Sequence, residues 1–314
     1  MTLTELRYIV SLARERHFGR AAEACFVSQP TLSVAVKKLE EELGVVLFER
    51  NASEISTTPL GERIVEQAQR VLEEAEGVKR LASQGKDQLA GPLRLGAIFT
   101  IGPYLMPALI PVLRERAPQM PIFIQENYTT QLVEHLKRGD VDVAILSLPF
   151  SEPSMLTQAV YDEPFRVVLP AGHAWLHKDE ISAASLAEEN VLLLSAGNCF
   201  RDQVLQACPA LNRQSSSLQK TLEGSSLDTI RHMVASGVGI TVLPSTAADP
   251  IPEQSKLLAV RPFAPEAPGR RIALAWRKTF PRSQAVEAVR LAILACALPG
   301  VSMLDEAPVS FQHL

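Results

Sequence analysis

The apolar residues of this chain change their spacing at Gly91-Pro92, and this change most limits the possible folds. Up to residue 90, apolar side chains recur every three or four positions, which is the spacing of one helix face. After residue 92, short aliphatic runs bounded by turn residues alternate with helical stretches, the pattern of an α/β domain. A chain of 314 residues also exceeds one ordinary domain of about 100–200 residues. We therefore expect a helical N-terminal part and a separate α/β part.

Residues 1–58 predict three helices followed by a two-stranded wing. Ser28 is suited to the N-cap of the third helix, Pro30 fits its first turn, and Gly44 fits its end. The run VVLFERNASEISTTP follows and indicates a short strand, a polar turn and a second strand. Three helices and a β-wing are the outline of a winged helix-turn-helix.

A helix-turn-helix reads bases with the N-terminal residues of its second motif helix. Gln can pair with adenine, Thr can touch a thymine methyl group or a phosphate, and Lys and Arg neutralise phosphates. The segment carries slightly more acidic than basic residues, which leaves a three-helix packing module as the alternative. The candidate DNA contacts are Gln29, Pro30, Thr31, Ser33, Lys37, Lys38 and Arg50, with Arg20 as a further phosphate contact.

Residues 59–90 predict one long linker helix that starts at Pro59. Its apolar stripe fits a coiled-coil seam sustained over about three heptads, which favours dimerisation. A solvated spacer helix and a helix packed on its own domain are the alternatives. The stripe consists of Leu60, Ile64, Ala68, Val71, Ala75, Val78 and Ala82.

The α/β part predicts a mainly parallel sheet. It is long for one doubly wound sheet, so we expect two lobes: residues 91–162 with 266–300 form the first, and 163–265 the second. Residues 301–314 are expected to be a C-terminal tail. The predicted strands are LRLGAI, PIFIQE, VDVAIL, FRVVLP, NVLLLS, GITVLP and RIALAW, and the predicted helices are 102–116, 129–138, 225–236 and 282–297.

Composition excludes several classes of protein. Apolar residues make up 46% and charged residues 21%, as in soluble globular proteins, and no run is apolar for the roughly 18 residues of a membrane helix. The start MTLTELRYIV does not resemble a secretory signal, so a cytoplasmic location is expected. A net charge of −4 argues against coating nucleic acid through bulk charge. The motifs HExxH, GxSxG, P-loop and paired CxxC are missing, so we expect no enzyme, metal or organic cofactor.

Four cysteines in a chain of this length do not form a disulfide scaffold. We expect two of them to have a different role from the other two. Cys25 and Cys296 lie among apolar neighbours and are expected to be inert core residues. Cys199 follows a turn and is predicted to begin a helix, where the helix dipole and nearby Arg201 favour a thiolate. A buried cysteine between strand and helix is the alternative interpretation.

Cys208 lies nine residues after Cys199. Nine residues of helix rise about 13.5 Å and leave the two side chains on opposite faces. A disulfide needs Cα atoms within about 7 Å, so the helix must unwind before these thiols can bond. Oxidation at one sulfur would then become a conformational change, which is what a switch requires.

The stretch AAEACFVSQPTLSVAVKKLEEELGVVLFER, followed by TPLGE, resembles the N-terminal signature of LysR-type transcriptional regulators. The resemblance covers the whole chain and implies a winged helix-turn-helix, a dimerising linker helix and a two-lobed effector domain like periplasmic binding proteins. It also implies a homotetramer, a dimer of dimers, that binds promoter DNA and works with RNA polymerase.

The segment LLLSAGNCFRDQVLQACPALN resembles the redox loop of peroxide-sensing members of this family. The resemblance implies an activator in which Cys199 is the peroxidatic and Cys208 the resolving cysteine, with reduction by glutaredoxin or thioredoxin. Some relatives carry His just before the reactive cysteine, where this chain has Asn198. A family member that binds a small metabolite between its lobes is the alternative. The implied ligand-binding residues are Thr100, Thr129, Asn198 and Asp202.

Overall fold

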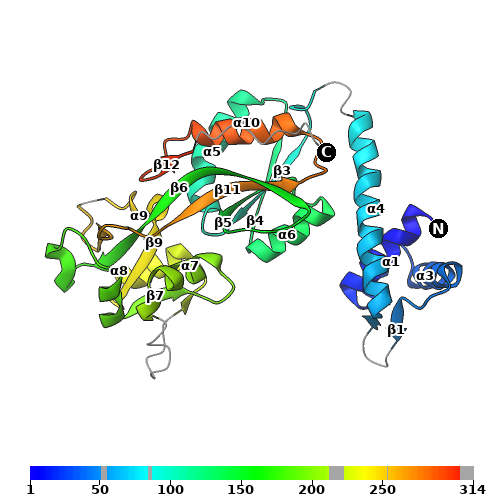
Figure 1. Ribbon diagram of the computed structural model, residues 1–314, viewed down its shortest axis with the longest axis horizontal. Helices are drawn as coiled ribbons and strands as arrows, with labels where there is room; N and C mark the ends of the chain where they lie inside the picture. The colour runs from blue at the N-terminus through cyan, green and yellow to red at the C-terminus, as the bar shows by residue number, and fades with distance from the viewer. Residues whose placement is uncertain (51–54, 84–86, 212–222, 253, 305–314) are drawn as a thin grey trace. The chain divides into compact units, whose positions relative to one another are not determined.

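The chain folds into two compact units, Met1–Lys86 and Asp87–Leu314. Figure 1 shows the computed structural model, which describes residues 1–50, 55–83, 87–211, 223–252 and 254–304. The boundary lies close to the change of apolar spacing at Gly91-Pro92. Each unit buries apolar clusters of its own, because the two spacings build different elements.

The N-terminal unit has the predicted order of helices and wing strands. The Ser28 hydroxyl accepts a hydrogen bond from the Thr31 backbone N–H at 3.4 Å and so caps the third helix. Gly44 ends that helix at a φ of 69°, a left-handed conformation that glycine adopts without strain. The elements are α1 (Leu3–Glu15), α2 (Phe18–Ala24), α3 (Gln29–Leu43), β1 (Phe48–Arg50), β2 (Ile55–Thr57) and α4 (Pro59–Ser83).

The linker helix α4 divides its predicted apolar stripe between two environments. Ile64 and Ala68 pack against the core that α1, α2 and α3 bury. Leu60, Val71 and Val78 are exposed. Packing on the helix's own domain therefore accounts for part of the stripe, and the exposed part stays available for another contact.

The expectation of one helix through residue 90 is wrong at its C-terminal end. α4 ends at Ser83, and residues 88–90 form a turn. The Arg282 guanidinium holds the chain in and after that turn, because it donates to the carbonyl oxygens of Gln88 at 2.9 Å and Pro92 at 2.6 Å. These carbonyls are thus satisfied by the C-terminal unit and not by another helical turn.

The C-terminal unit alternates strands and helices, as the sequence predicts. Its strands are β3 (Leu93–Ile98), β4 (Ile122–Asn127), β5 (Val143–Leu148), β6 (Met155–Pro170), β7 (Val191–Leu194), β8 (Glu223–Gly224), β9 (Ile240–Pro244), β10 (Leu258–Pro262), β11 (Gly269–Arg277) and β12 (Ser302–Met303). Its helices are α5 (Gly102–Arg116), α6 (Thr129–Arg138), α7 (Cys199–Ala207), α8 (Leu227–Ala235), α9 (Ser245–Ala248) and α10 (Ser283–Leu294), with the short 3-10 turns η1 (Ala174–His177) and η2 (Ala184–Glu188).

The sheet is mixed, so the expectation of a mainly parallel sheet is wrong. Strands run in the order β4-β3-β5-β11-β6-β9-β7-β8. β3 pairs in parallel with β4 and β5, and β7 with β8 and β9, but β11 and β6 pair antiparallel with each other and with their other neighbours. These two long strands pass from one part of the sheet to the other (Figure 1). Their length comes from connecting two lobes, which the aliphatic runs alone do not reveal.

Two apolar clusters define the two lobes. The first buries residues of β3, β5, α5, α6, β11 and α10, including Trp276. The second buries residues of β7, β9, α7 and α8, and Cys208 belongs to it. Part of the predicted tail also has a defined place, because Ser302–Met303 pairs with β6. In the described part of the chain, every helix is too short or too polar to cross a membrane.

Candidate functional site

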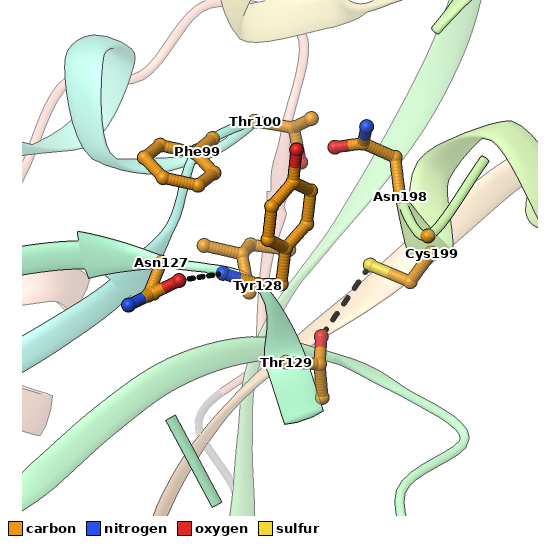
Figure 2. Close-up of a pocket in the computed structure, with 9 residues that line it drawn as sticks. Phe99, Thr100, Asn127, Tyr128, Thr129, Asn198 and Cys199 are labelled. Carbon is orange, nitrogen blue, oxygen red and sulfur yellow. Dashed lines mark hydrogen bonds between the residues drawn. The ribbon is translucent and has the colours of Figure 1, made fainter. Parts of the chain in front are cut away.

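Three chain segments meet in one pocket of the C-terminal unit, between its two lobes (Figure 2). Two of them follow the carboxyl ends of the parallel strands β3 and β4, a frequent position for ligands in α/β sheets. The third leads into α7. The pocket has an empty volume of about 190 Å³, counting the part open to solvent. It is lined by Ile98, Phe99, Thr100, Asn127, Tyr128, Thr129, Gly197, Asn198 and Cys199.

Cys199 is the first residue of α7, as predicted, and its half-buried side chain packs against the first lobe. The Thr129 hydroxyl donates to the Cys199 sulfur at 3.7 Å. This contact joins the start of α6 in one lobe to the start of α7 in the other. Arg201, expected to support the thiolate, donates from Nη1 to the Leu194 carbonyl oxygen at 2.8 Å.

Thr100 is buried on the first-lobe side of the pocket and is held by Arg270. Arg270 Nη1 donates to the Thr100 hydroxyl oxygen at 2.8 Å, and Nη2 donates to the Thr100 carbonyl oxygen at 2.9 Å. Arg270 is itself paired with Glu163 at 2.7 Å, and both side chains are fully buried. Since the Thr100 oxygen accepts from Arg270, its own proton can be donated to a molecule in the pocket.

The other two predicted ligand-binding residues have different positions. Asn198 is buried, lines the pocket and donates from Nδ2 to the Ser195 carbonyl oxygen at 3.1 Å. Asp202 is exposed on α7 and lies outside the set that lines the pocket. The pocket therefore brings together Cys199, Thr129, Thr100 and Asn198 of the predicted site.

Cys208 follows the last residue of α7 and lies in the apolar cluster of the second lobe, with 1% of its surface exposed. Burial raises the pKa of the Cys208 thiol to about 11. Both Cys199 and Cys208 are free thiols, and the intact helix between them spans about 13.5 Å. This is the separated arrangement that the spacing predicts.

The two faces of α7 contact different lobes. Cys199 packs against the first lobe, whereas Phe200 and Val204 are buried in the second. Gln203, one turn after Cys199, donates from Nε2 to the Ser147 hydroxyl at 2.7 Å and to the Leu148 carbonyl oxygen at 3.1 Å, at the end of β5. These hydrogen bonds were not predicted from the sequence.

In the N-terminal unit, six of the predicted DNA contacts lie on α3. Gln29, Pro30 and Thr31 are exposed at its start, and Ser33 is half-buried. Exposed Lys37 and Lys38 lie 3.7 Å from Glu41 and 3.6 Å from Glu5, respectively. Arg20 on α2 is exposed, and the Arg50 side chain lies outside the described residues. Val34 on the same helix is 68% exposed.

Comparison with known proteins identifies the family. A model of the LysR substrate binding domain matches residues 86–295, and a model of the bacterial regulatory helix-turn-helix protein, lysR family, matches residues 3–62. The chain belongs to the LysR family. The winged helix-turn-helix, the long linker helix and the two-lobed effector domain predicted from the sequence are thereby confirmed.

Individual members of the LysR family resemble this chain along nearly its whole length. The DNA-binding transcriptional dual regulator OxyR of Escherichia coli K12 is 38% identical over 94% of this chain and 95% of its own. The hydrogen peroxide-inducible genes activator of Pectobacterium carotovorum is 39% identical over 90% and 92%, respectively. A full-length OxyR variant from Pseudomonas aeruginosa is 52% identical, covers 98% of this chain and 99% of its own, and superposes with a TM-score of 0.78. A hydrogen-peroxide-bound OxyR mutant from Corynebacterium glutamicum is 33% identical, covers 93% and 91%, and has a TM-score of 0.63.

Proposed function

We propose that this LysR-family chain is a transcription activator that responds to hydrogen peroxide through Cys199. The observation that carries the proposal is the contact between the Cys199 sulfur and the Thr129 hydroxyl in a pocket that Thr100 also lines. A thiol in contact with one hydroxyl group, in a pocket that a second hydroxyl group also lines, suits peroxide reduction, because the leaving oxygen needs proton donors as the O–O bond breaks. Similarity to relatives named hydrogen peroxide-inducible genes activators supports this chemistry.

The reaction proceeds in two balanced steps. The Cys199 thiolate attacks one peroxide oxygen, the O–O bond breaks, and the departing hydroxide takes a proton to become water. The sulfur is oxidised to sulfenic acid by two electrons and the peroxide is reduced. Cys208 then attacks the sulfenic sulfur, which forms the disulfide and releases a second water. Because α7 separates the thiols, the second step requires that this helix unwind.

Unwinding of α7 couples the chemistry to the DNA. The helix packs on both lobes, so its loss changes how the effector domain is held together. In this proposal Gln29, Pro30, Thr31 and Ser33 contact bases, and Lys37, Lys38 and Arg50 contact phosphates of the promoter. The regulator works in the cytoplasm as a homotetramer with RNA polymerase. Glutaredoxin or thioredoxin reduces it, since a regulatory disulfide is the reducible kind.

Mass spectrometry of the cysteines after stoichiometric hydrogen peroxide tests the proposal. Wild type is expected to form the Cys199–Cys208 bond, and Cys208→Ser to stop at a Cys199 sulfenic acid. Thr129→Val is expected to slow oxidation on the order of tenfold to 100-fold, because one hydroxyl donor is lost. Cys25→Ser, on the N-terminal unit, serves as the control.

The proposal would be wrong if Cys199 stayed a thiol and reacted only slowly with hydrogen peroxide. If Cys199→Ser also kept its transcriptional response, the chain would be a metabolite-responsive regulator. The next experiment would then be a calorimetric screen for small metabolites that bind to the effector domain.

A further inference from the structure

Helix α3 carries an apolar side chain at the centre of its outward face. Its buried residues are Leu32, Val36 and Leu39. Successive residues of a helix turn by about 100°, which places Val34 opposite these three. Val34 is 68% exposed, whereas Val36 packs in the core of the N-terminal unit. The fold does not require a valine at position 34, because an exposed site tolerates polar residues at little cost in stability.

Two lysines flank Val34 one turn further along α3. Lys37 lies to one side of the centre of the face and Lys38 to the other. Their ammonium groups lie 3.7 Å from Glu41 and 3.6 Å from Glu5, respectively. Because both lysine side chains are exposed, these pairs contribute little and can give way to phosphates. An apolar group between two cations matches the major groove, where base edges lie between two phosphate backbones.

We propose that Val34 reads the methyl group of a thymine in the major groove of the promoter. The C5 methyl of thymine is the one methyl group that a base presents there. Val34 lies five positions after Gln29, the first residue of α3, and a helix-turn-helix reads bases from the N-terminal part of this helix. The match of residues 3–62 to a regulatory helix-turn-helix supports DNA as the partner of this face. The inference rests on the proposed function and adds a sequence preference to it.

The proposal makes binding depend on a single methyl group. Deoxyuridine differs from thymidine only in lacking this methyl. One replacement of the contacted thymine should weaken wild-type binding about fourfold, the effect of one buried methyl group. Val34→Ala should bind the thymine site at least about fourfold more weakly. It should also lose its sensitivity to deoxyuridine, because the alanine side chain is too short to reach the methyl. Such non-additivity identifies a direct contact.

Fluorescence anisotropy with the full chain measures these affinities. The probe is a duplex that the wild-type chain selects from a randomised pool, with each thymine replaced in turn by deoxyuridine. Dithiothreitol keeps Cys199 reduced throughout, so peroxide chemistry does not enter the result. Val46→Ala is the matched control, because Val46 is 63% exposed but lies beyond the C-terminal end of α3. Circular dichroism confirms that each variant is folded, as expected since alanine favours a helix.

Salt dependence separates contact with a base from contact with a phosphate. Val34 carries no charge, so Val34→Ala should leave the slope of log affinity against log salt concentration unchanged. Lys38→Ala should reduce that slope by about 1. A reduced slope in Val34→Ala would show that the variant has lost phosphate contacts, and this would overturn the proposed direct reading of a base.

The outcomes of the deoxyuridine series are distinct. A methyl-sensitive thymine that loses its effect in Val34→Ala and keeps it in Val46→Ala supports the proposal. Wild type that binds every deoxyuridine probe as tightly as the thymine probe overturns it, and so does Val34→Ala that keeps the wild-type sensitivity. If the chain enriched no sequence from the pool, promoter recognition itself would be missing, and the proposed function would fall together with this inference.

Discussion

Two neighbouring ion pairs on β6 and β11 show how burial changes what a charge does. Glu163 and Arg270 are fully buried, and Arg270 also holds both oxygens of Thr100 in the pocket. Asp162 and Arg271 form a pair of equal length, 2.7 Å, one residue along each strand, but both side chains are exposed. Water screens the attraction between Asp162 and Arg271, so that pair contributes little to stability. The attraction between Glu163 and Arg270 is stronger, but it must offset the free energy that both charges lose when they are buried away from water.

Removal of one partner should therefore have very different costs at the two positions. We expect Glu163→Gln to destabilise the effector domain by about 3–5 kcal/mol, since it leaves the Arg270 charge buried without a counter-charge. Asp162→Asn, the matched control, should cost less than about 1 kcal/mol. Urea unfolding followed by circular dichroism measures both, and equal losses would contradict this account.

The raised pKa of the Cys208 thiol predicts that the stability of the fold depends on pH. Its folded pKa of about 11 exceeds the ordinary value of 9.0, so below about pH 9 the thiol is neutral in both states and its contribution is constant. Between about pH 9 and 11 the unfolded chain releases the proton first, so wild type should lose up to about 3 kcal/mol relative to Cys208→Ala. Thermal unfolding of both proteins from pH 7 to 11 checks the difference. A difference that stays flat above pH 9 would show that the thiol is not protected from water.

At the scale of elements, α7 is the helix that packs against both lobes. One face carries Cys199 and Gln203 to the first lobe, and the other buries Phe200 and Val204 in the second. A disulfide with Cys208 has to take the helix away from both. Contacts made only by the intact helix thus stabilise the reduced state and set how readily the pair is oxidised.

The two Gln203 hydrogen bonds to β5 are such contacts. Gln203→Ala should remove about 1–3 kcal/mol from the reduced state, which makes the disulfide reduction potential more negative by about 20–60 mV. Titration in glutathione or dithiothreitol buffers, read by mass spectrometry, measures this shift. Gln206→Ala is the control, since Gln206 is exposed on the same helix. A potential that becomes less negative, or that matches Gln206→Ala, would mean that Gln203 does not favour the reduced state.

At the scale of the whole molecule, the exposed part of the α4 stripe supports association with a second copy. Val71 and Val78 are exposed and lie one heptad apart, a spacing that fits one coiled-coil seam. Ile64 and Ala68 already pack on their own unit. Pairing of two α4 helices would cover the apolar side chains that the fold of one chain leaves in water.

We predict that Val71→Lys combined with Val78→Lys weakens dimerisation at least about tenfold, because like charges would face each other across the seam. The melting temperature of the monomer should change little, because both side chains are exposed. Sedimentation velocity across protein concentration gives the dissociation constant. Val46→Lys is the control, with Val46 63% exposed before the wing. If the double variant sedimented like this control, the seam would lie elsewhere.

The sequence alone was enough for the elements whose signals are local. Ser28, Pro30 and Gly44 mark the ends of α3 because a cap acts on the turn that contains it. The position of Cys199 at the start of α7 follows from the turn before it. The roles of Thr100 and Thr129 came from family resemblance, since a threonine at a strand end is usually a helix cap.

Tertiary structure decided everything that depends on which distant segments meet. Thr129 and Cys199 touch across 70 positions of sequence, and Arg270 reaches Thr100 across 170. Charged and polar residues such as Arg270 and Gln203 are expected in water, so no pattern along the chain predicts their buried partners. The antiparallel course of β6 and β11 escaped prediction for the same reason. Periodicity reports which face of an element is apolar, but the partner of that face is chosen only when all elements pack together.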